Sequence, residues 1–189
     1  DVDASVLTPL SFPGQSSGQR FGRSLAFLPD PEADEAYLLV GASSNSIQPN
    51  FMKAGTVSVY SGSPRPGQGV GPVSEVQYSL DRNSSDLFGS AIEILDFNGD
   101  GVLDVAVSAR GEERPGNGVI EGLEQIGTCV RESAAGATYI YAGDGSLVNW
   151  AAPDFIYYAQ SNGGQSRVLS TGDFNGDGLQ DLAIAWYIL

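Results

Sequence analysis

The side chains best suited to chemistry in this sequence belong to a nine-residue phrase that occurs twice, at residues 96–104 and 173–181. Both copies have the form Asp-Phe-Asn-Gly-Asp-Gly-x-x-Asp. Carboxylate or amide oxygens therefore stand at positions 1, 3, 5 and 9, and glycines stand where the backbone must turn sharply. Ca²⁺ takes about six to eight oxygen ligands, some of them backbone carbonyls. The phrase thus predicts two calcium sites.

The predicted ligands are four side chains and one backbone carbonyl in each copy. They are Asp96, Asn98, Asp100, the carbonyl of Val102 and Asp104 in the first copy, and Asp173, Asn175, Asp177, the carbonyl of Leu179 and Asp181 in the second. An EF-hand would need a Glu at position 12 and flanking helices, whereas position 12 is Val107 or Ile184 in strand-like runs. A metal-free acidic turn is the alternative, because Asp, Asn and Gly favour turns. Two copies with four oxygens in phase favour calcium.

A structural role for this calcium is favoured over a catalytic one. No ligand position is spare for a substrate, and the absence of histidine excludes His-based triads and His-ligated zinc within the chain. Crowded carboxylates repel one another until a cation neutralises them, so calcium removal should lower stability. Extracellular modules bind calcium with Kd values of about 10⁻⁴–10⁻³ M. The sequence therefore predicts a secreted or cell-surface protein that is not an enzyme.

Short apolar runs, rich in β-branched or aromatic residues and bounded by Gly, Asp or Asn, surround the acidic loops and predict strands joined by turns. They cover residues 21–28, 37–42 and 55–60 in a first unit and residues 88–95, 105–109 and 136–141 in a second. The shift from Phe21 to Phe88 superimposes the first unit on the second, and the loop's side-chain positions become Pro29, Pro31, Ala33 and Tyr37. The first unit is therefore expected to keep the hairpin without a calcium site. A third unit aligns through its loop, with Gln165-Ser166 in place of Phe88-Gly89.

This order of motifs resembles the FG-GAP repeat of integrin α-subunit propellers. The matching motifs are Phe21-Gly22, Val40-Gly41-Ala42 and Gly55-Thr56-Val57 in the first unit, and Phe88-Gly89 and Gly136-Ala137-Thr138 in the second. The resemblance implies an all-β fold, a β-propeller of four-stranded antiparallel blades with calcium in the hairpin between the first two strands. The units are placed at about residues 5–62, 73–148 and 155–189. These two and a half to three blades are expected to be part of a larger, seven-bladed ring.

Charge and composition limit the classes of molecule that could be binding partners. The formal net charge of −14 argues against a nucleic-acid backbone or an anionic membrane surface. No apolar run is long enough to span a membrane. The single cysteine, Cys129, is either a buried thiol or pairs outside these residues. Asn83 begins a glycosylation sequon, a triplet that also arises by chance.

The insert that runs from Arg110 to Ala135 is the candidate ligand-binding segment. It links the second and third strands of the second unit, a connection that lies on the ligand-binding face of integrin-like propellers. Long loops on rigid scaffolds concentrate binding, although a solvated loop is the alternative. We therefore expect a calcium-stabilised module for protein binding or cell adhesion. The alternatives are an accessory propeller of a secreted phospholipase-like hydrolase whose catalytic domain lies elsewhere, and a subunit of a surface filament in which Cys129 joins neighbours.

Overall fold

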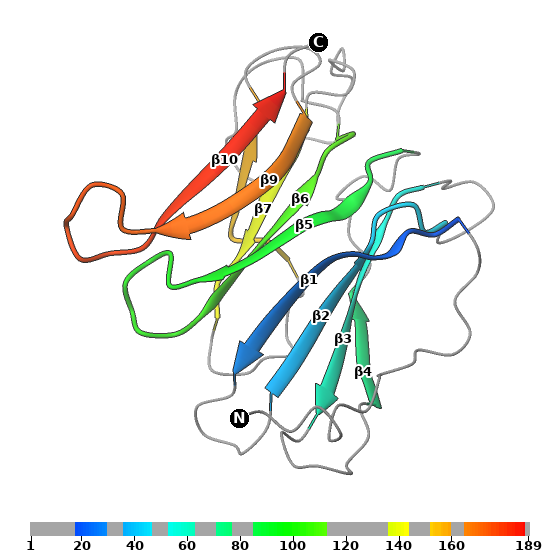
Figure 1. The fold of residues 1–189 in the computed structure, drawn as a ribbon, viewed down its shortest axis with the longest axis horizontal. Coiled ribbons are helices and arrows are strands. Elements are labelled where there is room, and N and C mark those ends of the chain that lie inside the picture. Colours follow the sequence, from blue (N-terminus) through cyan, green and yellow to red (C-terminus); the bar gives the residue numbers. More distant parts are fainter. Residues whose placement is uncertain are drawn as a thin grey trace, which may run out of the picture.

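The computed structural model contains strands arranged in three antiparallel sheets (Figure 1). It describes residues 18–29, 36–46, 53–62, 71–76, 85–112, 136–143, 152–159 and 165–187. All the regular elements in these ranges are strands, which agrees with the predicted all-β class. None of the described residues forms a helix with the length and apolar character needed to cross a membrane.

Two of the sheets have four strands, and each follows the order of the chain. The first sheet contains β1 (Phe21–Pro29), β2 (Ala36–Ala42), β3 (Thr56–Gly62) and β4 (Gly71–Val76). The second sheet contains β5 (Phe88–Leu95), β6 (Asp104–Ala109), β7 (Ala137–Tyr141) and β8 (Phe155–Tyr158). The third sheet, within the described residues, pairs β9 (Gln165–Gly172) with β10 (Asp181–Tyr187). The predicted unit of consecutive antiparallel strands is thus present.

The sheets divide the chain at different residues from the expected unit boundaries. Residues 73–76, expected in the second unit, belong to β4 and pair with β3 of the first sheet. Residues 155–158, expected in the third unit, form β8 and pair with β7 of the second sheet. The sequence pattern did not predict β4, because it begins with Gly71 and Pro72 and proline is tolerated in a strand only at an edge or a bulge. Here Pro72 stands opposite Tyr60 on an edge strand, next to a register shift.

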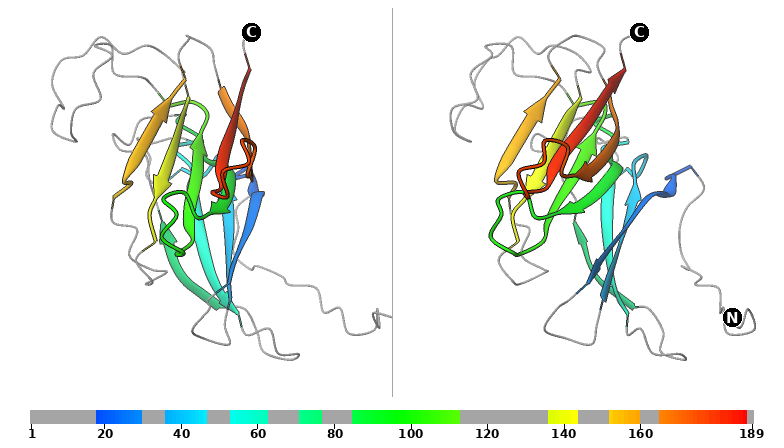
Figure 2. Two further views of the ribbon diagram at one scale, coloured as in Figure 1. Left: turned by 90° about the vertical axis from the view of Figure 1, so that its left-hand side faces the viewer. Right: turned by 60° about the vertical axis from the view of Figure 1, so that its left-hand side comes forward.

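The second sheet lies between the other two and buries both of its faces (Figure 2). One cross-strand row, Ile92, Val107, Tyr139 and Ile156, packs toward the first sheet, against residues such as Leu39 and Val59. On the opposite face, Ala106 and Ile140 are paired and pack with Leu169 of the third sheet. The alternation follows from the period of two along a strand. It explains why β6 and β7 are buried along their whole length.

Backbone contact at Phe88 and Gly89 joins the first two sheets. The Phe88 amide donates to the Ala54 carbonyl (2.8 Å), and Ser24 Oγ donates to the Gly89 carbonyl (2.8 Å). A Cβ atom at Gly41 would collide with the Gly89 carbonyl oxygen, which only glycine avoids. The Phe88 ring is fully buried and meets the edge of Tyr139 at a centroid distance of 5.6 Å. Phe88 therefore lies at the interface of two sheets.

Phe21, the corresponding residue of the first sheet, is half-buried. Its ring contacts Tyr60 of the same sheet, at a centroid distance of 6.3 Å. Gly22 and Gly89 follow these phenylalanines and share a φ of 78°, in the left-handed region that favours glycine. The register of β1 and of β5 shifts at this point. The Phe-Gly motif thus encodes the same irregularity in both sheets.

Gly89→Ala and Gly22→Ala separate the cost of backbone strain from the cost of sheet contact. Both changes force a residue with a side chain into the same φ, at about 1–2 kcal/mol each. Only at Gly89 does the new Cβ meet a neighbouring sheet, 2.6 Å from the Thr56 carbonyl oxygen, whereas at Gly22 it meets nothing within 4 Å. Urea unfolding should show Gly89→Ala to be less stable than Gly22→Ala by about 1–3 kcal/mol. Equal losses would contradict the packing role of Gly89.

Candidate metal centres

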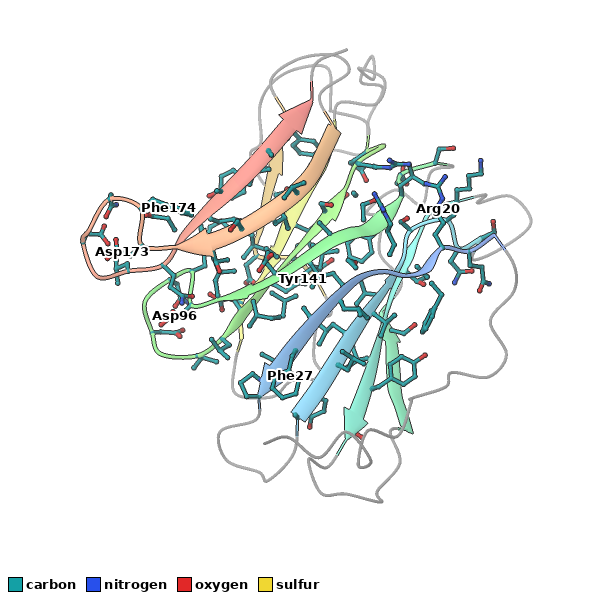
Figure 3. All side chains as sticks on the ribbon, viewed as in Figure 1. Arg20, Phe27, Asp96, Tyr141, Asp173 and Phe174 are labelled. Atoms are coloured by element: carbon teal, nitrogen blue, oxygen red, sulfur yellow. The ribbon has the colours of Figure 1, made fainter. Side chains whose placement is uncertain are left out.

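The two acidic loops lie at the turns between the first and second strands of their sheets, where the sequence predicted them. The first connects β5 with β6, and the second connects β9 with β10. Both project from the same side of the molecule, and Asp96 and Asp173 mark them in Figure 3. The corresponding segment of the first sheet, residues 30–35 between β1 and β2, lies outside the described residues, as do Asn83 and Cys129.

Within the first loop, the Asp96 carboxylate organises the turn. Its Oδ1 accepts hydrogen bonds from the amides of Gly99 (2.7 Å) and Asp100 (3.1 Å), and its Oδ2 accepts one from Gly101 (2.9 Å). Gly99 and Gly101 have φ values of 75° and 84°, which place these amides toward the carboxylate. The glycines at positions 4 and 6 are therefore required by the shape of the turn.

Asn98 and Asp100 complete the first loop. Asn98 Oδ1 accepts from the Asp100 amide (2.9 Å), and Asn98 Nδ2 donates to Asp100 Oδ2 (2.8 Å). Asp100 Oδ1 accepts from the Val102 amide (2.7 Å). The side chains at positions 1, 3 and 5 are thus held toward the same stretch of backbone. The Val102 carbonyl, a predicted ligand, lies at the end of that stretch.

The second loop has the same hydrogen bonds at the equivalent positions. Asp173 accepts from the amides of Gly176 (2.7 Å), Asp177 (3.1 Å) and Gly178 (2.9 Å). The remaining bonds join Asn175 Oδ1 to the Asp177 amide, Asn175 Nδ2 to Asp177 Oδ2, and Asp177 Oδ1 to the Leu179 amide, at 2.8, 2.9 and 2.8 Å respectively. The repeated phrase therefore produces a repeated conformation in two sheets.

The aspartates at position 9 of the two acidic loops differ in their surroundings. Asp104 is 1% exposed, and its two oxygens accept from the amides of Phe97 (2.7 Å) and Gly143 (2.8 Å). Asp181 is half-buried, and its Oδ2 accepts from the Phe174 amide (2.8 Å). Gly143 follows β7, so the additional bond of Asp104 fastens the loop to the third strand of its sheet.

The donor set of each loop fits a hard cation in its chemistry. All the predicted ligands are oxygens, and a carboxylate has about four acceptor sites. The three amides that bond to Asp96 leave part of that capacity available to a cation. In the described part of the chain, no cluster of three or more His, Cys, Asp or Glu side chains is arranged so that it could hold a metal ion. Calcium ligation in either loop would therefore need the Asn side chain and the backbone carbonyl as well as the carboxylates.

An open cleft of about 470 Å³ separates the two loops, and Asp96, Asp100 and Leu179 contribute to its lining. Gln180 bridges it, because its Oε1 accepts a hydrogen bond from the Asp96 amide (2.9 Å). The sequence did not point to Gln180 as a site residue. The available signal was that position 8 is polar in the second loop and apolar, Leu103, in the first.

The opposite end of the second sheet carries the insert predicted to bind a partner. Residues 113–135 of this insert lie outside the described residues, but its two ends are described. The Gly136 amide donates to the Glu112 carbonyl (2.9 Å), and the Tyr139 hydroxyl donates to Glu112 Oε2 (2.6 Å). Glu112 is 3% exposed and Tyr139 is fully buried. A buried carboxylate and a phenol therefore hold the two ends of the insert together.

The pKa of Tyr139 is raised well above its usual value, first because burial disfavours the phenolate and then because the Glu112 carboxylate lies beside it.

Comparison of the sequence with known protein families agrees with this geometry. Stacked antiparallel sheets that repeat an acidic, glycine-shaped hairpin define an all-β repeat protein. The FG-GAP repeat family model matches residues 88–120 and 166–185, which contain both acidic loops. FG-GAP repeats form β-propeller blades, typically in integrin-like proteins, and often bind calcium. No curated protein matches the sequence significantly.

Asp104→Ala and Asp181→Ala test the unequal burial of the ninth positions. In EGTA, Asp104→Ala leaves two part-buried amides without their acceptor, at about 1–3 kcal/mol each. Asp181→Ala affects one amide at a more exposed site and should cost less than about 1 kcal/mol. Denaturant unfolding of both variants without calcium measures the difference. Equal destabilisation would show that the Gly143 bond does not contribute.

Alkaline unfolding tests the environment of Tyr139. An unfolded tyrosine has a pKa of about 10, and the folded pKa is higher, so the folded state retains its proton above that pH. The contribution of Tyr139 to stability is therefore complete below pH 10 and is lost as the pH rises toward the folded pKa, with a slope of up to about 1.4 kcal/mol per pH unit. Urea unfolding between about pH 9 and 11.5 should show a shallower decline for Tyr139→Phe. An equally steep decline in Tyr139→Phe and in the unchanged protein would contradict this assignment.

Proposed function

We propose that this chain is part of an extracellular β-propeller that is stabilised by calcium at two hairpins and binds a protein ligand at its opposite end. The proposal depends mainly on one observation: the two acidic loops have the same conformation and project from the same side of neighbouring sheets. The family match, which contains both loops, supports it.

Electrostatics favour a cation at each hairpin. Each loop places three aspartates and one asparagine within nine residues, and the loop tips are exposed. Like charges at this spacing repel one another, and a bound Ca²⁺ would replace repulsion with attraction. The hydrogen bonds from backbone amides to the Asp96 and Asp173 carboxylates already hold the turns in shape. We therefore assign calcium a structural role.

The third sheet supports a larger ring. Phe97 packs on Phe155 and Tyr157 of β8, at centroid distances of 5.7 and 6.5 Å. Phe174 has the same position in the third sheet, but 63% of it is exposed (Figure 3). A fourth strand like β8 would cover Phe174. The repeat itself thus indicates two further strands in this sheet.

The first sheet supports the same conclusion from its outer face. Leu25 and Phe27 of β1 are 59% and 62% exposed, whereas Ala26 and Leu28 pack toward the second sheet. Repeat proteins bury such faces against neighbouring repeats. Another blade against β1 would cover these side chains, and a propeller closes with about four to eight blades. We propose a seven-bladed ring.

The ligand-binding face is proposed to lie at the insert between β6 and β7. The connection is long and charged, and Glu112 and Gly136 hold its ends together. A loop on a rigid base loses less conformational entropy when it binds. We assign the chain no catalytic role, because it has no histidine and the six aspartates of the two acidic loops are assigned to calcium. The expected calcium affinity suits an extracellular site.

Calorimetry with and without calcium tests the proposal. Calcium at 100-fold above its Kd should stabilise the fold by about 2.7 kcal/mol per site. Asp100→Ala and Asp177→Ala should each remove about half of the increase in melting temperature, and the double variant should remove nearly all of it. Asp34→Ala, an acidic residue from the segment that lacks the ligand pattern, is the matched control and should keep the full increase. An identical melt in EGTA and in calcium would refute the calcium assignment.

A further inference from the structure

We infer that Gln180 couples the two hairpins, so that a calcium ion bound in the second loop raises the affinity of the first. The inference rests on the proposed calcium function but assigns a role to a residue that is not itself a ligand. Gln180 is a positioning residue: its side chain acts on Asp96, the first ligand position of the neighbouring loop.

The position of Gln180 in its own loop makes this coupling possible. It stands between Leu179, whose carbonyl is a predicted ligand, and Asp181, the ninth ligand position. A cation in the second loop would fix the backbone on both sides of Gln180. The positions that the Gln180 side chain can reach would thereby be restricted. The Gln180 Oε1 would then be held in place as an acceptor.

Gln180 contacts the first loop at Asp96, the residue whose side chain accepts the most backbone hydrogen bonds in that loop. Gln180 Oε1 accepts from the Asp96 amide at 2.9 Å, between residues 84 positions apart in the sequence. The Asp96 side chain in turn accepts from three amides of its loop. A second contact supports the first, because a Cβ at Gly99 would lie 3.1 Å from Leu179 Cδ2. Ordering of Gln180 should therefore order Asp96.

Electrostatics alone predict the opposite sign. Each loop contains three aspartates, so an empty second loop attracts a cation to the first loop more strongly than a filled one does. At physiological ionic strength the screening length is about 8 Å, which weakens this effect. A hydrogen bond of ordinary strength corresponds to about a twofold to tenfold change in affinity. Positive coupling would thus rule out electrostatics between the loops as its only cause.

The chain itself provides the test variant. Leucine occupies the equivalent position of the first loop, Leu103, so Gln180→Leu removes the acceptor and keeps a residue that this type of turn accommodates. Gln180→Glu keeps an acceptor oxygen and serves as the conservative control. Asp177→Ala disables the second loop without changing any residue that contacts Asp96.

The experiment is a calcium titration of the intact chain followed by NMR at the Gly101 and Asp96 amides, which reports the first loop alone. With Gln180 present, Asp177→Ala should weaken calcium binding in the first loop about twofold to tenfold. In the Gln180→Leu background the same change should have no effect or slightly strengthen binding, and in the Gln180→Glu background the weakening should return. Hydrogen exchange at the Asp96 amide should slow on filling the second loop only when the acceptor is present.

The outcomes separate this inference from the proposed function. If both loops bind calcium but Asp177→Ala leaves the first loop unchanged in every background, the coupling is refuted and the calcium function stands. If coupling persists in Gln180→Leu, it does not pass through this residue and the inference is equally refuted. If neither loop binds calcium, the proposed function fails, and the inference fails with it.

Discussion

The close backbone approach between the first two sheets sets the geometry of the rest of the molecule. Gly41 and Gly55 come so near to Gly89 and Phe88 that a side chain at either glycine would displace the neighbouring sheet. This approach lets the Phe88 amide bond to the Ala54 carbonyl and places the Phe88 ring in the shared core. Because sheets normally pack about 10 Å apart, such contact at one end fixes where the second sheet begins. The direction of β5, and with it the position of the first acidic loop, follows from that contact.

The second and third sheets are joined by a different device. Ser108 occupies the register position of Gly41, and Gln165-Ser166 replaces the Phe-Gly pair, so the same close approach is not encoded there. Ser108 is fully buried, and its hydroxyl finds no hydrogen-bond partner within the described residues. Apolar packing of Leu169 on Leu95 and Ala106 supplies the contact between these sheets. The polar bridge lies instead at the far end of β5, where Gln180 meets Asp96. The two interfaces are thus fastened at opposite ends of the same strand.

Sequence patterns correctly predicted the features that depend on residues close together in the chain. The acidic phrase, its glycines and the flanking apolar runs specified both hairpins, because each turn is closed by bonds within five residues of Asp96 or Asp173. The approximate unit ranges did not anticipate that β4 pairs with β3 and β8 with β7, since proline and short aromatic runs are ambiguous without knowledge of their partners. The bonds of Asp96 to Gln180 and of Asp104 to Gly143 join residues 84 and 39 positions apart, and no spacing rule could have suggested them.

Carboxylates join β6 and β7 at both ends, which connects the first acidic loop with the insert that is proposed to bind a ligand. At one end Asp104, the last predicted ligand of the first loop, accepts a hydrogen bond from the Gly143 amide just beyond β7. At the other end Glu112, just beyond β6, accepts from the Tyr139 hydroxyl. Both carboxylates are nearly inaccessible to solvent, so loss of either partner would leave a buried charge that is costly to accommodate. A cation that orders Asp104 and a ligand that engages the insert would therefore act on the same pair of strands. In the proposed function, this shared pair of strands would give a structural calcium ion a physical means to influence binding at the opposite end of the sheet.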